Sequence, residues 1–457
     1  MDQMTVSDET MTGEYNEAYR PQFHFTARKN WLNDPNGLVF YDGEYHLFFQ
    51  HNPISLEFGL ISWGHAVSPD LVHWQQIADA LAPDALGPIW SGSAVVDWEN
   101  TSGFGHGSDP PLVTLYTAAG DPFSQCLAFS LDRGRTWTKY EQNPVLPQIV
   151  SGNRDPKVVR HAPFRQWIMA LYLDGSDFAL FASPDLKTWT RLQTLTLPGC
   201  DECPDFFEMP VQGSPNERKW VFTAANGHYL VGTFDGQTFL PETGVVPSDY
   251  GANFYAVQTY SDIPETDGRR IQIAWMRGGE YPQMPFNQQM NFPCELTLRR
   301  TPDGLRLHRQ PVREIAGLYG KEQRWHGLTL APGDNPLHAL SGDLWDIRVE
   351  FEVESAAALG LRVRGEDVRC NVNDKTLTML GQTAPLKLDG GRLALRLLVD
   401  RTSLEVFADG GQISMTGCFL PSPDGSTLAV FAEGGSAKIV SLTVHPLRSA
   451  WPRPEKM

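Results

Sequence analysis

The sequence has few cysteines, no excess of basic residues and no long apolar run. Six cysteines in 457 residues are too few for a disulfide framework, so we expect free thiols. A formal net charge of −17 argues against a nucleic-acid partner. No apolar stretch is long enough to span a bilayer, which argues against a membrane protein. Long stretches with helical periodicity are also missing, so helix should be a minor component.

The first 19 residues are acidic and polar, with neither a basic start nor an apolar segment. They do not resemble a signal peptide, and we expect a disordered tail. Without an export signal the protein is expected to be cytoplasmic, or extracellular if such a signal has been removed. The composition is compatible with a homo-oligomer.

Metal binding by cysteine is not expected. Cys200 and Cys203 form the only closely spaced cysteine pair, in a Cys-x-x-Cys arrangement. A structural zinc ion needs two further ligands, and no second cysteine or histidine pair has suitable spacing.

A turn motif recurs along the first two thirds of the chain. Segments 68–74, 130–137 and 183–189 share a Ser-x-Asp start and a closing Trp, and 234–239 is a weaker copy. The closing aromatic residues are 63, 52 and 50 residues apart. A repeat of about 50 residues made of strands and turns predicts a β-propeller with four-stranded blades. We expect each turn near the outer edge of a blade, with its Trp packed between strands.

Five polar residues precede apolar runs between these turns, and one per blade gives five blades. They are Asp34, Ser91, Asp155, Glu202 and Asn253. The innermost strands of a propeller begin at the same end of its channel, so these side chains should converge on one funnel. We assign the propeller to residues 20–310.

The pattern changes after residue 310. Residues 311–324 are expected to form a linker. Alternating strands separated by Asp-Gly-Gly turns then predict a β-sandwich over residues 325–450. The fold class is therefore all-β: a five-bladed β-propeller followed by a C-terminal β-sandwich.

Three carboxylates are the candidate catalytic groups: Asp34, Asp155 and Glu202. Glycoside hydrolysis needs two converging carboxyl groups, one facing the sugar carbon and one protonating the departing oxygen. In a purely structural alternative, Asp34 and Asp155 cap turns before prolines, and Glu202 pairs with Arg154.

Several motifs in the chain closely resemble those of glycoside hydrolase family 32, the invertase, levanase and inulinase family of β-fructofuranosidases. The matching segments are Trp-Leu-Asn-Asp-Pro-Asn-Gly at 31–37, Phe-Phe-Gln at 48–50, Trp-Gly-His-Ala at 63–66, Ser-Gly-Ser at 91–93, Arg-Asp-Pro at 154–156, Glu-Cys-Pro-Asp at 202–205, and 399–407. The family's propeller and sandwich agree with the division reached from the repeats. Details at 19–25 and 95–104 look more like levanases than invertases.

The resemblance implies a retaining double displacement without metal or cofactor. Asp34 would be the nucleophile, Glu202 the acid/base, and Asp155, held by Arg154, the transition-state stabiliser. The substrate-binding residues would be Asn33, Gln50, Phe58, Trp90, Ser91, Arg154 and Trp275. Burial or negative charge should raise the pKa of Glu202, and hydrogen bonds should keep Asp34 ionised. The two carboxyl groups of such a retaining pair should lie roughly 5–5.5 Å apart.

Some positions depart from the family pattern. Phe58 stands where many members have Trp, Asp201 stands where the family usually has Trp or an aliphatic residue, and Asn253 replaces a frequent acid. Trp275 is not followed by the usual second aromatic residue. These changes leave the nucleophile and acid intact but affect expectations about the leaving group.

The expected substrate is an oligosaccharide, polysaccharide or small sugar. The first hypothesis is release of terminal β-fructose from fructo-oligosaccharides, levan or inulin, and from sucrose. An invertase-like sucrose hydrolase or a fructosyltransferase of the same family is an alternative. Alternatives of other kinds are an inverting propeller glycosidase and a non-catalytic glycan-binding propeller.

Overall fold

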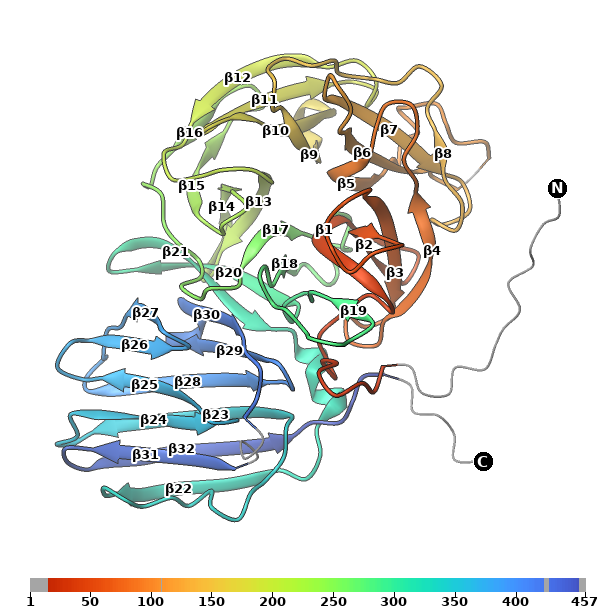
Figure 1. Cartoon of the computed structure of the whole chain (residues 1–457). Coiled ribbons are helices and arrows are strands. Elements are labelled where there is room, and N and C mark those ends of the chain that lie inside the picture. Colours follow the sequence, from red (N-terminus) through yellow and green to blue (C-terminus); the bar gives the residue numbers. More distant parts are fainter. Residues whose placement is uncertain (1–14, 108, 423–426, 452–457) are drawn as a thin grey trace.

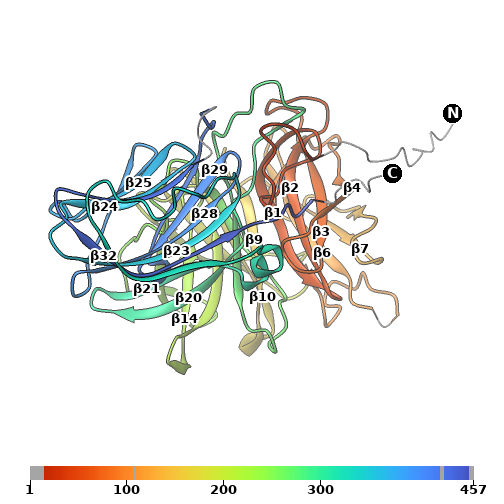
Figure 2. The same ribbon diagram turned by 90° about the horizontal axis from the view of Figure 1, so that it is seen from below.

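The computed structural model describes residues 15–107, 109–422 and 427–451 (Figure 1). Strands dominate this part of the chain, together with the short 3-10 helices η1 (Ala162–Phe164), η2 (Arg313–Leu318) and η3 (Asp409–Gly411). None of the helices in these ranges is long and apolar enough to cross a membrane. A ring of sheets is followed by two stacked sheets, which lie beside the ring in Figure 1 and in front of part of it in the view of Figure 2. The prediction of a propeller followed by a sandwich is confirmed.

The first three blades each contain a meander of four antiparallel strands, with the first strand nearest the ring's centre (Figure 1). Blade I comprises β1 (Asn30–Tyr41), β2 (Glu44–Asn52), β3 (Ser62–Ser68) and β4 (Gln75–Leu81); blade II comprises β5 (Ile89–Val96), β6 (Leu112–Ala118), β7 (Ser124–Ser130) and β8 (Thr138–Lys139); blade III comprises β9 (Arg154–His161), β10 (Gln166–Asp174), β11 (Asp177–Ser183) and β12 (Thr190–Thr196).

The last two blades complete the ring. Blade IV comprises β13 (Asp205–Val211), β14 (Ser214–Thr223), β15 (Tyr229–Phe234) and β16 (Phe239–Pro241); blade V comprises β17 (Tyr255–Thr259), β18 (Arg270–Trp275), β20 (Cys294–Thr301) and β21 (Gly304–Pro311). The short β19 (Phe286–Asn287) pairs in parallel with β1, so the chain after β18 closes the ring onto blade I. Each innermost strand contacts the innermost strands of its two neighbouring blades.

The repeated turns connect the third and fourth strands of blades I, II and III, as predicted. In each turn the indole Nε1 donates to a carbonyl three residues earlier: Trp74 to Leu71 at 3.1 Å, Trp137 to Gly134 at 3.1 Å, and Trp189 to Leu186 at 3.0 Å. The Asp carboxylate of each turn accepts backbone N–H groups, for example Asp70 from His73 at 2.8 Å. The motif is therefore a structural one.

The C-terminal body is a sandwich of two antiparallel sheets. The six-stranded sheet contains β22 (Gln323–Leu330), β32 (Ala437–Pro446), β23 (Trp345–Val353), β28 (Arg392–Val399), β29 (Ser403–Ala408) and β30 (Ile413–Cys418); the five-stranded sheet contains β27 (Gln382–Pro385), β26 (Thr376–Met379), β25 (Glu366–Asn371), β24 (Ala358–Val363) and β31 (Leu428–Glu433). Alternate residues of facing strands, such as Leu395, Leu397 and Leu361, form its buried core.

The chain around the predicted tail and linker has defined contacts. Tyr15 is buried and stacks on Trp451 with ring centroids 4.1 Å apart. The expectation of a disordered tail therefore does not hold for residues 15–19, and residues 1–14 lie outside the described part. The segment expected to be a linker, 311–324, contains η2 between β21 and β22.

A buried ionic cluster joins the N-terminal segment to the sandwich. His24 Nδ1 lies 2.8 Å from Asp400 Oδ2, and His24 Nε2 lies 2.8 Å from Glu405 Oε2. All three side chains are fully buried. Phe292, just before β20, donates its backbone N–H to Glu405 at 3.1 Å. The cluster thereby connects the N-terminal segment, the segment before β20 and the sandwich.

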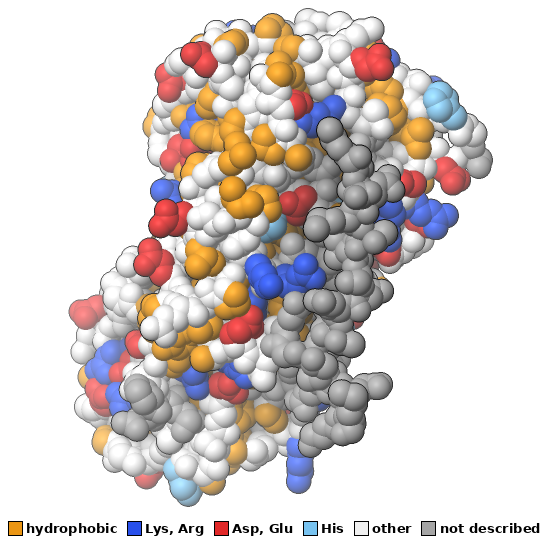
Figure 3. Space-filling view, turned by 45° about the vertical axis from the view of Figure 1, so that its right-hand side comes forward, with side chains coloured by type: hydrophobic (Ala, Val, Ile, Leu, Met, Phe, Trp, Pro, Cys, Tyr) orange, Lys and Arg blue, Asp and Glu red, His pale blue; other side chains and the backbone are white. Residues whose placement is uncertain are grey.

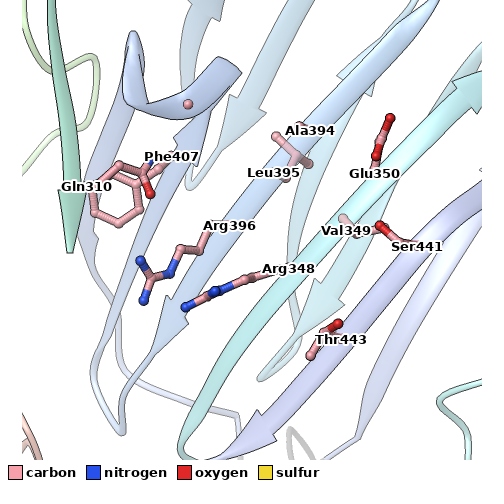
Figure 4. Close-up of a pocket in the computed structure, with 11 residues that line it drawn as sticks. Gln310, Arg348, Val349, Glu350, Ala394, Leu395, Arg396, Phe407, Ser441 and Thr443 are labelled. Carbon is pink, nitrogen blue, oxygen red and sulfur yellow. The ribbon is translucent and has the colours of Figure 1, made fainter. Parts of the chain in front are cut away.

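A cavity of about 390 Å³ lies where the sandwich faces the last blade (Figure 4). Gln310 at the end of β21 faces Phe407 and Arg396 of the sandwich. The Arg396 guanidinium is bound to Asp346 at 2.7 Å. None of the predicted site residues lines this cavity. On the face shown in Figure 3, acidic and basic side chains are scattered among apolar ones.

Candidate active site

All five blades contribute to one cavity of about 400 Å³. It is lined by Trp31, Asn33, Asp34, Gln50, Phe58, Trp90, Arg154, Asp155, Glu202, Cys203, Tyr255, Trp275 and Arg277. Most of these side chains come from the innermost strands or the segments just before them, whereas Gln50 and Trp275 lie on the second strands β2 and β18, and Phe58 and Arg277 follow those strands. The predicted convergence of residues from distant repeats is therefore observed for the three carboxylates.

The backbone at the cavity is held in unusual conformations. Asp155, Glu202 and Cys203 have φ angles of 64°, 45° and 36°, in the left-handed region that non-glycine residues seldom adopt. Hydrogen bonds hold these turns in place: Thr117 Oγ1 accepts from the Asp155 N–H at 2.9 Å, and Asp155 Oδ2 accepts from the Cys203 N–H at 3.0 Å. The strained turns direct the carboxylates into the cavity.

Asp34 lies on the floor of the cavity and receives several hydrogen bonds. Ser91 Oγ donates to its Oδ2 at 2.5 Å, Gln50 Nε2 to the same oxygen at 3.3 Å, and Asn33 Nδ2 to Oδ1 at 3.1 Å. Burial has the largest effect and raises the pKa of Asp34, while the bonds from Ser91 and Asn33 oppose this. The predicted donors are present, but burial outweighs them.

Asp155 and Cys203 lie beside Asp34. The Cys203 Sγ is 3.6 Å from Asp34 Oδ2 and 3.5 Å from Asp155 Oδ2, so the buried thiol bridges the two carboxyl groups. Arg154 Nε lies 3.7 Å from Asp155. Burial raises the pKa of Asp155 to about 7, against the opposing charge of Arg154. Burial also raises the pKa of Cys203, which keeps it a neutral thiol.

Glu202 lies in the cavity wall and is more exposed than Asp34. Arg154 Nη2 contacts its Oε1 at 2.5 Å, and the Tyr255 hydroxyl bonds to its Oε2. Burial raises the pKa of Glu202, but the bonds from Tyr255 and Arg154 outweigh it and leave the pKa below its usual value. The expectation of a raised pKa is thus wrong for this structure, because two donors favour the carboxylate. The alternative Glu202–Arg154 pair does form, but both residues also line the cavity.

Aromatic rings form the rest of the wall. Trp31 makes edge contacts with Phe58 and Trp275 at centroid distances of 6.5 and 6.2 Å, and Phe58 meets Trp90 at 6.1 Å. Phe58 is 51% exposed and therefore lies at the rim. Apolar rings combined with a few convergent polar groups are typical of a pocket for a small-molecule ligand.

Comparisons with known proteins identify the family. The N-terminal domain of glycosyl hydrolases family 32 matches residues 24–311, and the C-terminal domain of that family matches residues 368–446. The chain belongs to glycoside hydrolase family 32.

This family 32 chain is similar to several known proteins. It is 41% identical to a levanase of Bacillus subtilis (strain 168), over 97% of this chain and 73% of that protein. It is 34% identical to a levanase of Bacillus sp. (strain L7), over 96% of this chain and 53% of that protein. The crystal structure of an exo-inulinase from Aspergillus awamori superposes with a TM-score of 0.88 at 30% identity, covering 96% of this chain and all of that one.

Two residues predicted to lie at the funnel of this family 32 enzyme do not line the cavity. Ser91 is fully buried, and its Oγ donates to Asp34 and accepts from Gln50 Nε2, so it supports the carboxylate from behind. Asn253 instead joins blade V to the sandwich, because its Nδ2 donates to the Arg277 carbonyl at 2.6 Å and its Oδ1 accepts from the Cys418 N–H at 2.8 Å.

Four cavity residues were not predicted as site residues: Trp31, Cys203, Tyr255 and Arg277. Trp31 lies two residues before Asn33, Cys203 follows Glu202, and Tyr255 begins β17, the innermost strand of blade V. Arg277 lies over the rings of Tyr255 and Trp275, at 4.6 and 5.9 Å from their centroids. The repeat pattern does not predict a positively charged group at that wall.

Proposed function

We propose that this family 32 hydrolase is an exo-acting β-fructosidase, which releases terminal β-D-fructose from fructo-oligosaccharides, levan or inulin, and from sucrose. The observation that carries the proposal is the presence of Asp34 and Glu202 in the same cavity with different partners. Asp34 is buried among hydrogen-bond donors, whereas Glu202 lies against Arg154 and Tyr255. The levanase and exo-inulinase names of similar proteins support the choice of fructans.

In the first step we assign the nucleophile to Asp34 and the acid to Glu202. A carboxylate oxygen of Asp34 forms a bond to C2 of the terminal fructosyl unit. The bond from C2 to the leaving oxygen breaks with its electron pair on that oxygen, which takes the proton from Glu202. In the second step Glu202 takes a proton from water, the water oxygen bonds to C2, and the ester bond to Asp34 breaks.

The remaining residues bind the sugar and stabilise charge. Asp155, held near Arg154, faces the positive charge that develops on the sugar ring in the transition state. Asn33 and Gln50 offer amide groups to the fructose hydroxyls, and the aromatic wall contacts its apolar face. No step in this scheme uses a metal or a cofactor.

A product profile tests the proposal. The purified protein is incubated with sucrose, an inulin oligomer series and levan, and products are separated by anion-exchange chromatography over time. We expect fructose from the earliest points, with substrates shortened by one unit at a time. Early release of larger oligomers would contradict exo action, and binding of these sugars without any release would favour a glycan-binding protein.

A further inference from the structure

Two neighbouring carboxylates compete for one tyrosine hydroxyl beside the candidate acid. The Tyr255 hydroxyl bonds to Glu202 Oε2 and also lies 3.3 Å from Asp201 Oδ2. A phenol carries a single proton, so it can donate to only one of the two carboxylates at a time. In this structure the shorter contact is to Glu202.

Asp201 is otherwise poorly satisfied. Its Oδ1 is buried and has no hydrogen-bond partner among the described residues. A buried unpaired carboxylate oxygen destabilises a fold, so its retention calls for an explanation. Asp201 does not line the cavity itself, and its side chain accepts a hydrogen bond from the cavity residue Tyr255.

The proposed chemistry creates a requirement that Asp201 can meet. Glu202 must be a protonated acid in the first step and a carboxylate in the second. Arg154 and Tyr255 both donate to Glu202 and so favour only its carboxylate form. Something must therefore support the protonated form if both steps are to proceed at similar pH.

We propose that Asp201 is a positioning residue that accepts a hydrogen bond from the Tyr255 hydroxyl when Glu202 is protonated. The Tyr255 hydroxyl then has a hydrogen-bond acceptor in both protonation states of Glu202. This inference rests on the acid/base role proposed for Glu202. A charged acceptor binds a hydroxyl more strongly than a neutral carboxylic acid does, so protonation of Glu202 favours rotation of the phenol hydrogen toward Asp201. The negative charge of Asp201 also disfavours early loss of the Glu202 proton.

Proton balance is maintained throughout. Tyr255 keeps its proton and only redirects its hydrogen bond. The proton of Glu202 moves to the leaving oxygen in the first step and is replaced from water in the second, and Asp201 exchanges none.

Other ionisable groups around the two carboxylates act in both directions. Arg154 and Arg277 favour charge on Glu202, and Arg277 and His228 favour charge on Asp201. Asp34, Asp155, Tyr172, Cys200 and Cys203 also face this pair. Burial raises the pKa of Asp201, and the charge of Glu202 adds to this effect. The two carboxylates are therefore electrostatically coupled.

The test measures the protonation of Glu202 directly, by 13C NMR of labelled glutamate carboxyl groups, with Glu202→Gln identifying the signal. Asp201→Asn keeps the size of the side chain but removes its charge, and we expect the Glu202 midpoint to fall by about one pH unit. Asp374→Asn removes the same charge from an exposed turn of the sandwich and should leave the midpoint unchanged. An unchanged midpoint in Asp201→Asn would overturn the proposal.

A second variant separates the hydroxyl route from a simple charge effect. In a Tyr255→Phe background no hydroxyl can switch, so Asp201→Asn should shift the Glu202 midpoint by less than it does with Tyr255 present. Equal shifts of the Glu202 midpoint in the two backgrounds would show that Asp201 does not act through the Tyr255 hydroxyl, and would overturn the proposal. These titrations need no turnover, so they remain decisive even if the proposed substrate is wrong.

The pH profile of kcat/KM provides a further readout where the enzyme is active. The basic limb should move to lower pH in Asp201→Asn, in step with the titration, while the rate at the acidic end changes little. A loss of equal size at every pH, with normal folding, would mean that Asp201 only maintains structure and would contradict the inference.

Discussion

Ser91 donates its hydroxyl to Oδ2 of Asp34 at 2.5 Å, between the first strands of blades II and I. Ser91 is fully buried and does not line the cavity, so it acts on the carboxylate rather than on a ligand. A hydrogen bond to a charged group favours the charged form. A residue of blade II thus lowers the pKa of a carboxyl group in the neighbouring blade I.

Replacement of this serine should affect chemistry more than binding. Ser91→Ala removes a bond worth about 1.5–3 kcal/mol, so we expect kcat to fall roughly 10- to 100-fold with a smaller change in KM. The pKa of Asp34 should rise, which moves the acidic limb of the pH profile to higher pH. Ser93→Ala is the control, because the Ser93 hydroxyl bonds to the Pro156 carbonyl and should not move that limb.

Arg154 should control the basic limb of the pH profile of activity. Arg154→Met removes the cation that contacts Glu202 and lies near Asp155. The pKa of both carboxyl groups should rise, so the basic limb moves to higher pH while the maximal rate falls by about 100-fold. Arg160→Met removes an arginine of the same strand that pairs with Glu99 instead, and it should preserve activity. A basic limb that stays in place would contradict the assigned electrostatics.

Phe58 should contribute to substrate binding without supporting the fold. It is 51% exposed at the rim, so Phe58→Ala should raise KM about 3- to 10-fold with kcat and melting temperature nearly unchanged. Leu240→Ala removes another exposed apolar side chain, on β16, and serves as the matched control. An unchanged KM for every fructan would exclude Phe58 from the binding wall.

The buried histidine between the N-terminal segment and the sandwich should make stability depend on pH. Burial alone would lower the pKa of His24, but bonds to Asp400 and Glu405 raise it from 6.5 to about 9. The stabilisation is therefore complete below pH 6.5 and is lost as pH rises through about 9. Urea unfolding between these values should show a loss on the order of 3 kcal/mol.

Substitution of the histidine tests the same cluster. His24→Gln leaves two buried carboxylates without their cation and should destabilise the protein by about 3–5 kcal/mol at neutral pH. It should also flatten the pH dependence. His73→Gln alters an exposed His–Asp pair and should do neither. Parallel pH curves for the wild type and His24→Gln would show that the cluster does not cause the effect.

The sequence predicts the architecture well because repeats and turn chemistry are local. The spacing of Trp74, Trp137 and Trp189 locates the outer edges of three blades, and the same side-chain bond forms in each turn. Asp34 and Glu202 follow from the same periodicity, because Asp34 lies in the first half of β1 and Glu202 lies just before β13. Their convergence requires only that the ring closes.

Properties that depend on contacts between blades could not be predicted in the same way. The lowered pKa of Glu202 depends on Tyr255, which lies in the next blade and contacts it only in the folded protein. Asn253 has the expected place in the repeat, but the sandwich draws its side chain away from the funnel. The sequence pattern predicts which residues lie at one end of the ring, but it does not predict which side chain each of them contacts there.

Covalent trapping on the Glu202→Ala enzyme tests the central assignment most directly. With a fructosyl fluoride or aryl fructofuranoside as substrate, the good leaving group needs no acid, and the second step lacks its base. The reaction is quenched with acid, digested and analysed by mass spectrometry. We expect a fructosyl ester on the peptide that carries Asp34, and this ester should decrease when azide is added. An ester on the Asp155 peptide, or continued turnover with no ester at all, would contradict the assignment.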